Sequence, residues 1–246
     1  MSTTHWHLHR EGAVTSIRFA RPPAHDLRFA DLRALRTVLA EVGADETVSV
    51  VILGCAEEGR FLGHAEPAEI AAVRSGELPA EVMTEWLTTL LAIEDLPQPV
   101  IAAIEGPARG GGHELALACT FRLAGPGAVF QQHEIDRAAM PGAGATQRLP
   151  RLIGPGRAAR MIMTGRPVDA GEAARIGLAD EVLTGPDLRG QVLARAATLA
   201  RKPRRSLVAI KQALLAAGRL PLQEGLQREQ ELFLDVLGVR PDRPRR

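Results

Sequence analysis

The sequence predicts an α/β fold, because segments typical of strands and of helices alternate along the first half of the chain. Residues 13–19 (AVTSIRF) alternate in polarity as a strand does, and residues 48–53 (VSVVIL) form the β-branched apolar run of a buried parallel strand. Between them, residues 31–42 place apolar side chains at helical spacing, and Gly43 marks the stop. A strand, a helix and a second strand in this order favour a parallel sheet with right-handed crossovers.

The chain continues this alternation before it becomes helical. Pro67 suits the first turn of a helix, where its missing N–H costs nothing, and residues 82–93 predict a further helix. Residues 121–124 and 129–131 predict short strands around a Gly-Pro-Gly turn. From Gly154 onward the pattern becomes almost wholly helical, with breaks at Pro167, Gly177, Pro186, Pro203 and Pro221. We expect residues 240–246 to form a solvated, charged tail.

Length and composition indicate one large domain, or one domain with an appendage, and they exclude several classes of partner. The 246 residues can bury a sizeable core, and the 46% hydrophobic and 24% charged content is ordinary for a globular protein. The net charge is +1, so no global field favours nucleic acid or an anionic membrane. Aromatic residues make up 3% and tyrosine is absent, which argues against a base-stacking surface. We therefore expect no nucleic acid and no membrane among its partners.

The cysteines and the N-terminal residues indicate the compartment. Cys55 and Cys119 lie in apolar segments without CxxC or Cys/His spacing, so we expect buried free thiols in a reducing environment. The first ten residues, MSTTHWHLHR, lack the apolar region of a signal peptide. No apolar run approaches the length of about eighteen residues that a membrane-spanning helix needs. These features predict a cytoplasmic protein.

The stretch over residues 101–120, IAAIEGPARGGGHELALACT, contains the main candidate site. An apolar run that ends at Glu105 predicts a buried strand, and a glycine-rich turn leads into an alanine- and leucine-rich helix from Glu114. A helix N-terminus leaves backbone N–H groups unpaired, so the backbone of residues 110–112 can hold a negatively charged ligand oxygen. Glycine leaves room for that oxygen because no side chain projects from its Cα. Glu114 would add a carboxylate, and a plain turn with a surface glutamate is the alternative.

A metal site and a dinucleotide site are alternatives that the pattern does not favour. Adjacent residues on a helix point about 100° apart, so His113-Glu114 and His133-Glu134 make poor pairs of metal ligands, and HExxH is absent. Neither GPARGGGHE nor GAGATQ satisfies GxGxxG, and GxxxxGK[ST] does not occur. We expect no metal.

Three ordered blocks of the sequence resemble the crotonase (enoyl-CoA hydratase/isomerase) superfamily. They are PVIAAIEGPARGGGHELALACTFRLAG, VFQQHEIDRAAMPGAGATQRLPRLIG and TGRPVDAGEAARIGLADEV, and the resemblance runs from about residue 12 to about residue 235. It implies a spiral of ββα units with a helical C-terminal region that mediates trimer contacts, often with two trimers forming a hexamer. We expect a crotonase-like spiral core over residues 1–190 and a helical trimerisation region over residues 191–246.

The resemblance also implies roles for particular residues. Gly111 matches the glycine whose N–H is one donor of the family's oxyanion hole, and Ala65 matches the other donor when FLGHAEPAEI is aligned without a gap. His64 then stands where the family has glycine, and with a one-residue gap His64 itself becomes the donor. Glu114 and Glu134 match the two catalytic carboxylates of enoyl-CoA hydratases.

Three further residues are candidates for substrate binding. Gln132 matches a polar neighbour of the second carboxylate, and His64 and Gly142 complete the set. The acyl group itself stays open, because we expect the residues that line its pocket to lie on the loops around residues 66–90 and 136–145.

These residues predict reversible addition of water to a 2-enoyl-CoA thioester. Negative charge gathers on the thioester oxygen during this reaction, and each of two N–H donors would stabilise it by ~3 kcal/mol. Two carboxylates position the water and transfer protons, and their proximity separates their titrations. We expect a hydro-lyase of fatty acid metabolism whose partner is an acyl-CoA thioester. It needs no cofactor, because CoA is part of the substrate.

Two alternatives remain open. Family members that shift a double bond typically use one carboxylate near the position of Glu134, so the pair of glutamates favours a hydratase over an isomerase. The second alternative is a crotonase-like subunit without hydratase activity that acts on another acyl thioester or only binds it. His64 and Pro67 depart from the family pattern, RPPAHDL is shorter than its usual counterpart, and the family's terminal basic and aromatic segment is not recognisable. These departures predict weaker CoA affinity or a different acyl carrier.

Overall fold

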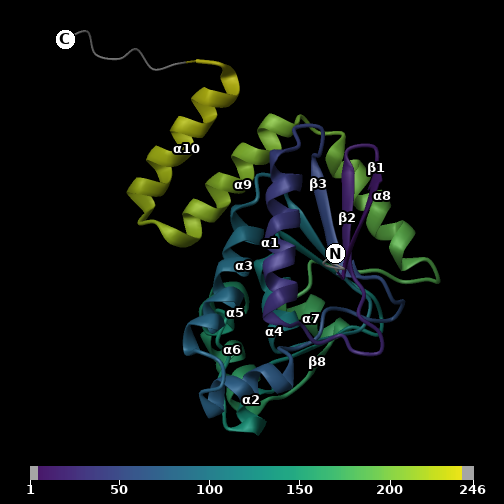
Figure 1. Ribbon diagram of the computed structural model, residues 1–246. Helices are drawn as coiled ribbons and strands as arrows, with labels where there is room; N and C mark the ends of the chain where they lie inside the picture. The colour runs from purple at the N-terminus through teal and green to yellow at the C-terminus, as the bar shows by residue number, and fades with distance from the viewer. Residues whose placement is uncertain (1–4, 240–246) are drawn as a thin grey trace.

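The computed structural model describes residues 5–239, and it confirms the predicted α/β class (Figure 1). In chain order the elements are β1 (Trp6–Glu11), β2 (Val14–Phe19), α1 (Phe29–Ala44), β3 (Val50–Cys55), α2 (Pro67–Ser75), the 3-10 helix η1 (Ala80–Met83), α3 (Thr84–Asp95), β4 (Val100–Ile104), β5 (Pro107–Arg109), α4 (Gly111–Ala118), β6 (Phe121–Ala124), β7 (Val129–Gln131), the 3-10 helix η2 (Glu134–Arg137), α5 (Ala145–Ile153), α6 (Pro155–Thr164), β8 (Val168–Asp169), α7 (Ala170–Ile176), β9 (Glu181–Val182), α8 (Leu188–Ala200), α9 (Arg204–Arg219) and α10 (Leu222–Leu237).

The strands form two sheets whose order follows the succession of elements along the chain. The larger sheet has the order β1-β2-β3-β4-β6-β9, and the smaller has the order β5-β7-β8. In the larger sheet β1 is antiparallel to β2, and every later neighbour is parallel. The parallel neighbours need crossovers, which α1 supplies between β2 and β3 and α3 between β3 and β4. The predicted strand, helix and strand therefore form the start of this sheet.

Both faces of the larger sheet are buried at β3 and β4, which explains the unbroken apolar runs of these two strands. Along β3, Val51 and Leu53 belong to the main hydrophobic core, which also contains side chains of α1 and α3. Val50 and Ile52 point to the other face and join a smaller core with Val192 of α8. Successive side chains of a strand alternate between faces, so a strand covered on both sides is apolar at every position. Figure 1 shows α1 and α8 on opposite sides of these strands.

The sequence located most of these elements and missed the polar or very short ones. The helix predicted from Glu66 or Pro67 onward begins at Pro67, and the strands over residues 121–124 and 129–131 have the expected bounds. The strand β1 was not expected, because five of its six residues are exposed and it has no apolar pattern. The central helix begins at Gly111 and not at Glu114, since the glycine run itself supplies the first turn.

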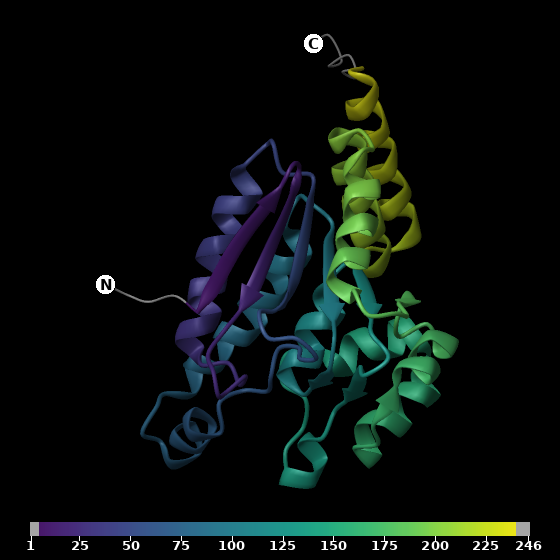
Figure 2. The same ribbon diagram turned by 90° about the vertical axis from the view of Figure 1, so that its right-hand side faces the viewer.

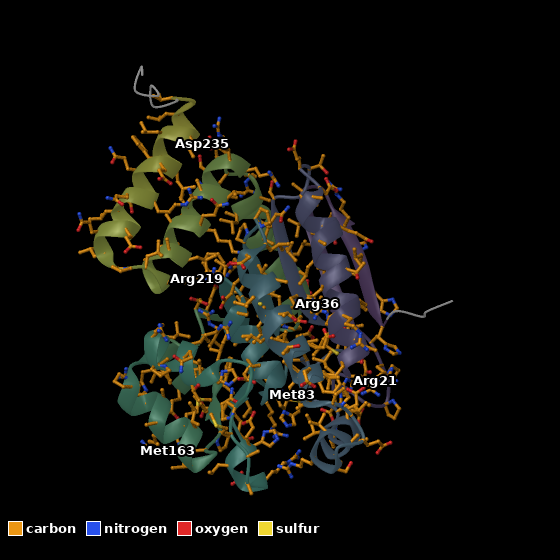
Figure 3. The ribbon with its side chains drawn as sticks, turned by 60° about the vertical axis from the view of Figure 1, so that its left-hand side comes forward. Arg21, Arg36, Met83, Met163, Arg219 and Asp235 are labelled. Atoms are coloured by element: carbon orange, nitrogen blue, oxygen red, sulfur yellow. The ribbon has the colours of Figure 1, made fainter. Side chains whose placement is uncertain are left out.

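The C-terminal helices α9 and α10 pack side by side and project away from the sheets (Figure 2). Lys211 of α9 is buried, and its Nζ donates to the carbonyl oxygens of Leu96 and Gln98 at 2.6 and 2.9 Å. Arg219, labelled in Figure 3, pairs with Glu94 and Asp95 at the end of α3. Polar contacts to the end of α3 therefore attach this helical pair to the core.

The sequence predicts a boundary between residues 190 and 191 and a charged tail over residues 240–246. The division between residues 190 and 191 falls within α8, which packs against β2, β3 and β4, and as a domain boundary it stays a prediction. The tail over residues 240–246 lies outside the described residues. No helix in the described range 5–239 is long and apolar enough to cross a membrane.

Candidate active site

The site begins where β4 leads through β5 into α4. Gly110 precedes the helix with φ +49° and ψ −123°, a conformation that suits glycine alone. A Cβ at Gly110 would lie 2.1 Å from His64 Nδ1, and a Cβ at Gly112 would lie 2.0 Å from the carbonyl oxygen of Leu62. The three consecutive glycines therefore let the first turn of α4 pack directly against the segment 61–66.

The segment 61–66 carries the second predicted N–H donor, and residues 25–27 hold it in place. Gly63 N–H donates to the His25 carbonyl at 2.8 Å, and Leu27 N–H donates to the His64 carbonyl at 2.8 Å. His64 N–H donates to Asp26 Oδ1 at 2.9 Å. Ala65 N–H has no acceptor among the described residues 5–239. Of the two candidates that the sequence left open, Ala65 is thus the one with a backbone donor free for a ligand.

His64 also contacts the other predicted donor through its side chain. Gly111 N–H donates to His64 Nδ1 at 3.3 Å. Burial, followed by the neighbouring His133 and Arg137, lowers the pKa of His64 to about 4, so its imidazole is neutral near pH 7. The His64 and His133 rings lie 4.8 Å apart between centroids. His64 is a predicted substrate-binding residue, and its side chain contacts Gly111, the better-supported predicted donor.

Both predicted catalytic glutamates line one mainly apolar pocket of about 140 Å³. Glu114 comes from the first turn of α4, and Glu134 begins η2 after β7. Gly111 and Gly142 line the same pocket, so the structure brings together most of the predicted site. The full lining comprises His64, Ala65, Ile70, Met83, Trp86, Gly111, Glu114, Glu134, Ala139, Met140, Gly142 and Ala143.

The two carboxyl groups are buried, and burial weakens their acidity. Glu114 Oε1 accepts the N–H groups of Ala143 and Ala145, both at 2.9 Å. Its burial nevertheless raises the pKa of Glu114 to about 7, and the charge of Glu134 contributes in the same direction. Burial also raises the pKa of Glu134, against the opposing effect of Arg137. Near neutral pH the pair can therefore hold a proton and release one, as acid–base chemistry requires.

Gln132 is not among the residues that line this pocket, and its role in substrate binding stays a prediction. It is fully buried, and the orientation of its amide that satisfies both neighbours lets His113 Nδ1 donate to its oxygen at 3.1 Å. Its nitrogen then donates to both carboxylate oxygens of Glu134 at 3.1 Å. Burial lowers the pKa of His113 to about 3, so this ring is neutral. Gln132 is therefore positioned to orient Glu134.

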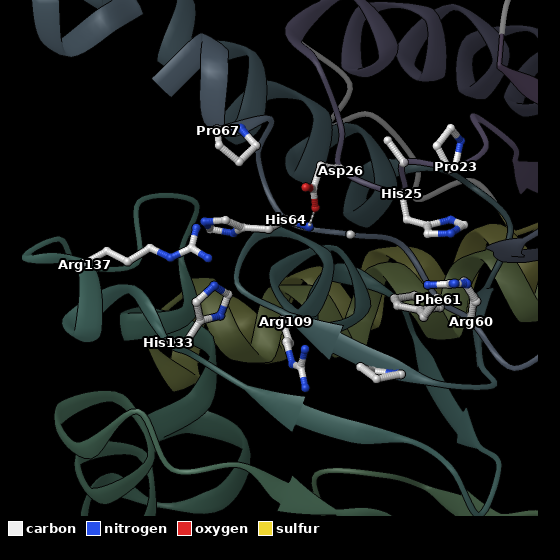
Figure 4. A pocket seen from close by; sticks show the side chains of 13 residues that line it. Pro23, His25, Asp26, Arg60, Phe61, His64, Pro67, Arg109, His133 and Arg137 are labelled. Carbon is white, nitrogen blue, oxygen red and sulfur yellow. Dashed lines mark hydrogen bonds between the residues drawn. The ribbon is translucent and has the colours of Figure 1, made fainter. Parts of the chain in front are cut away.

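A larger outer cavity of about 410 Å³, drawn in Figure 4, shares the lining residue His64 with the inner pocket. Three arginines and three histidines are among its lining residues: Arg60, Arg109, Arg137, His25, His64 and His133. Residues 23–26 of the segment RPPAHDL form part of the wall of this cavity. A cavity of this size and positive character suits an extended ligand that carries phosphate groups.

Trp86 is the main site residue that sequence reasoning did not single out. Its indole lies against the first turn of α4, so that a Cβ at Gly111 would meet Trp86 Cζ3 at 2.6 Å. Trp86, Met83 and Ile70 come from residues 66–90, and Ala139, Met140 and Ala143 from residues 136–145, the two ranges expected to line the acyl pocket. The sequence offered only these ranges, because helical spacing does not tell a pocket wall from core.

The fold and the site define an α/β protein that can receive a carbonyl oxygen at backbone N–H groups beside two buried carboxyl groups. The sequence pattern described as enoyl-CoA hydratase/isomerase matches residues 9–240. The chain therefore belongs to the enoyl-CoA hydratase/isomerase family.

Individual relatives agree with this assignment. The chain is 32% identical to a crotonyl-CoA hydratase of Syntrophomonas wolfei, over 94% of this chain and 88% of that protein. It is 36% identical to a short-chain-enoyl-CoA hydratase of Clostridium acetobutylicum, over 74% and 69%. The crystal structure of an enoyl-CoA hydratase from Bacillus anthracis superposes with a TM-score of 0.91 at 35% identity, over 96% of this chain and 92% of that one.

Proposed function

We propose that this protein is an enoyl-CoA hydratase, which adds water reversibly across the double bond of a 2-enoyl-CoA thioester. The observation that carries the proposal is the meeting of Glu114 and Glu134 in one pocket with Ala65 and Gly111. A pair of N–H donors suits an enolate oxygen, and a pair of carboxyl groups suits the two proton transfers of hydration. Relatives of similar length carry the same activity in their names.

In the proposed reaction the thioester oxygen accepts hydrogen bonds from Ala65 N–H and Gly111 N–H. One ionised carboxylate takes a proton from water as the water oxygen bonds to the β-carbon, and the π electrons move to form the enolate. A protonated carboxyl group then delivers a proton to the α-carbon, and the thioester carbonyl returns. Because the pKa of Glu114 is raised to about 7, one of the two carboxyl groups can be protonated at neutral pH while the other is ionised.

The two cavities support a division of the substrate between them. We place the enoyl group in the inner pocket of about 140 Å³ and the CoA portion in the outer cavity of about 410 Å³. CoA is then part of the substrate, and the chemistry needs no metal and no further cofactor. The arginines of the outer cavity supply the positive charge that phosphate groups require.

Glu114→Gln and Glu134→Gln test this function. Each variant should hydrate crotonyl-CoA about 10²- to 10⁴-fold more slowly than the wild type, because an amide cannot transfer the proton. Loss of the enoyl-thioester absorbance measures the rate, and the exposed Glu46→Gln variant is the matched control. Full activity in both pocket variants, or no turnover by the wild type across enoyl chain lengths, would show the proposal to be wrong.

Product analysis separates the alternatives. A hydratase yields 3-hydroxyacyl-CoA from a 2-enoyl-CoA, whereas an isomerase yields the 3-enoyl thioester without uptake of water. Comparing CoA thioesters with the same acyl groups on a carrier protein tests whether CoA is the natural carrier. A non-hydratase subunit would bind the thioester and return it unchanged.

We further propose that the protein assembles as a trimer or a dimer of trimers and acts in the cytoplasm. Exposed apolar side chains on α9 and α10 support the assembly: Ile210, Leu214, Leu222, Leu226, Phe233 and Leu237. Such side chains gain stability when a second copy covers them. Two buried cysteines without a disulfide are consistent with a reducing compartment.

A further inference from the structure

His64 stands between the two cavities of the site. Its side chain lines both the outer cavity and the inner pocket, and it is the one residue that the two linings share in the described part of the chain. Figure 4 shows its ring extending from the segment beside Asp26 toward Arg137, with His133 below it. A ligand that fills both cavities at once must therefore pass His64.

The imidazole also occupies the place that the substrate oxygen needs. Gly111 N–H donates to His64 Nδ1 at 3.3 Å, so this donor is already engaged by an acceptor of the protein itself. An oxyanion takes such a donor at about 2.7–3.1 Å, which leaves no room for the imidazole nitrogen at the same position. The ring is neutral because burial depresses its pKa, and in the tautomer protonated at Nε2 its Nδ1 has the lone pair that accepts from Gly111 N–H.

The surroundings allow the side chain to move while its backbone stays in place. Asp26 Oδ1 accepts from His64 N–H, and the His64 carbonyl accepts from Leu27 N–H, so the backbone is held on both sides. Inward movement is blocked, because the ring already lies against Gly110, where an added Cβ would be 2.1 Å from His64 Nδ1. The outer cavity, by contrast, has about 410 Å³ of space beside His133. Rotation about the side-chain bonds of His64 toward that cavity frees Gly111 N–H.

We propose that His64 is a gate that closes the oxyanion site in the free protein and must rotate outward before a thioester carbonyl can bind. The inference rests on the proposed function for the identity of the ligand. Since only molecules with the open gate bind, the gate raises the measured dissociation constant by the inverse of the open fraction. The gate is thus a determinant of substrate affinity, and it stands at a position where the family pattern has glycine.

The variants His64→Ala and His64→Gly test the gate. Butyryl-CoA is the probe, because a saturated thioester binds without being hydrated. Both variants should bind it about three- to tenfold more tightly than the wild type. This factor corresponds to the free energy of one hydrogen bond, the bond from Gly111 to His64 that substrate binding must break in the wild type. The Michaelis constant for crotonyl-CoA should fall by a similar factor. Isothermal titration calorimetry and steady-state kinetics measure these quantities, and His9→Ala, an exposed histidine on β1, is the control.

Unchanged or weaker binding of butyryl-CoA in both variants would overturn the gate. A fall in kcat of more than about tenfold would overturn it as well, since His64 would then act on the chemistry. A measurement on the wild type decides the question if the variants fail to fold: butyryl-CoA should shift the His64 Nδ1 resonance in nitrogen NMR, and an unchanged resonance contradicts the proposal. Because these binding readouts need no turnover, failure of the hydratase assay leaves the test of the gate intact.

Discussion

At the scale of single residues, burial sets the protonation of Glu114. Its carboxyl group is 3% exposed, and two backbone N–H groups on Oε1 only partly offset the loss of water. The folded protein therefore binds this proton more tightly than the unfolded chain does. The resulting contribution to stability is full below pH 4.5, the ordinary pKa, and is lost as the pH rises through about 7.

The variant Glu114→Gln removes this dependence, because an amide does not titrate and its oxygen can still accept from Ala143 and Ala145. The free energy of unfolding of the variant should rise relative to the wild type between about pH 5 and about pH 8, by up to about 3 kcal/mol. Denaturant unfolding at each pH measures the difference, and the exposed Glu46→Gln serves as control. Parallel stability curves for wild type and Glu114→Gln would contradict the assignment.

At the scale of elements, the contact between α4 and the segment 61–66 sets the spacing of the two proposed N–H donors. Gly112 makes this contact possible, because a Cβ there would lie 2.0 Å from the Leu62 carbonyl oxygen and 2.6 Å from that of Gly63. Both obstacles are backbone atoms, so a larger residue can be accepted only if the whole segment moves. Such a movement separates Ala65 N–H from Gly111 N–H.

Gly112→Ala should therefore reduce stability by about 1–3 kcal/mol through overpacking, although alanine is the better helix former. Hydration of crotonyl-CoA should also fall by at least about tenfold, because the two donors no longer converge on one oxygen. Thermal unfolding and the absorbance assay measure the two effects. The control is Gly156→Ala in α6, where an added Cβ meets no atom within 4 Å. Equal behaviour of the two variants would refute the role given to this contact.

At the scale of the whole molecule, the exposed apolar face of α10 is a candidate contact surface between copies of the chain. Leu222, Leu226, Phe233 and Leu237 lie on one side of the helix by their spacing, and each is more than half exposed. A face of this kind in a helix that projects from the core suits contact with another copy of the chain. Lys211 and Arg219 hold the neighbouring helix against the core, so the face is presented in a fixed direction.

The double variant Leu226→Glu and Phe233→Glu should convert the proposed trimer or hexamer to monomer. Each copy of the chain would bring two unpaired negative charges into the buried interface. Light scattering coupled to size-exclusion chromatography measures the mass, and circular dichroism shows whether the monomer is folded. The matched control places glutamate at Gln227 on the polar side of α10. A wild-type protein that is monomeric at all concentrations would refute the assembly.

Local pattern was sufficient for much of the fold and for the identity of the reacting groups. Strands such as residues 121–124 and the helix at Pro67 follow from apolar runs, turns and proline position, which act over a few residues. The exposed strand β1 carries no such signal, because only its hairpin pairing with β2 defines it. The two-residue strands β8 and β9 are defined by pairing with strands distant in the sequence.

The sequence by itself determined the glycine run, the two glutamates and the family, since these depend on residue type and order along the chain. The tertiary structure decided which N–H groups are free, where His64 points, and that Gln132 supports Glu134 from behind. The reason is that these hydrogen bonds join residues far apart in the sequence. The bond from His64 N–H to Asp26, for example, spans 38 positions. Packing of distant segments thus gives an acceptor to His64 N–H and leaves the next N–H, that of Ala65, without one among the described residues.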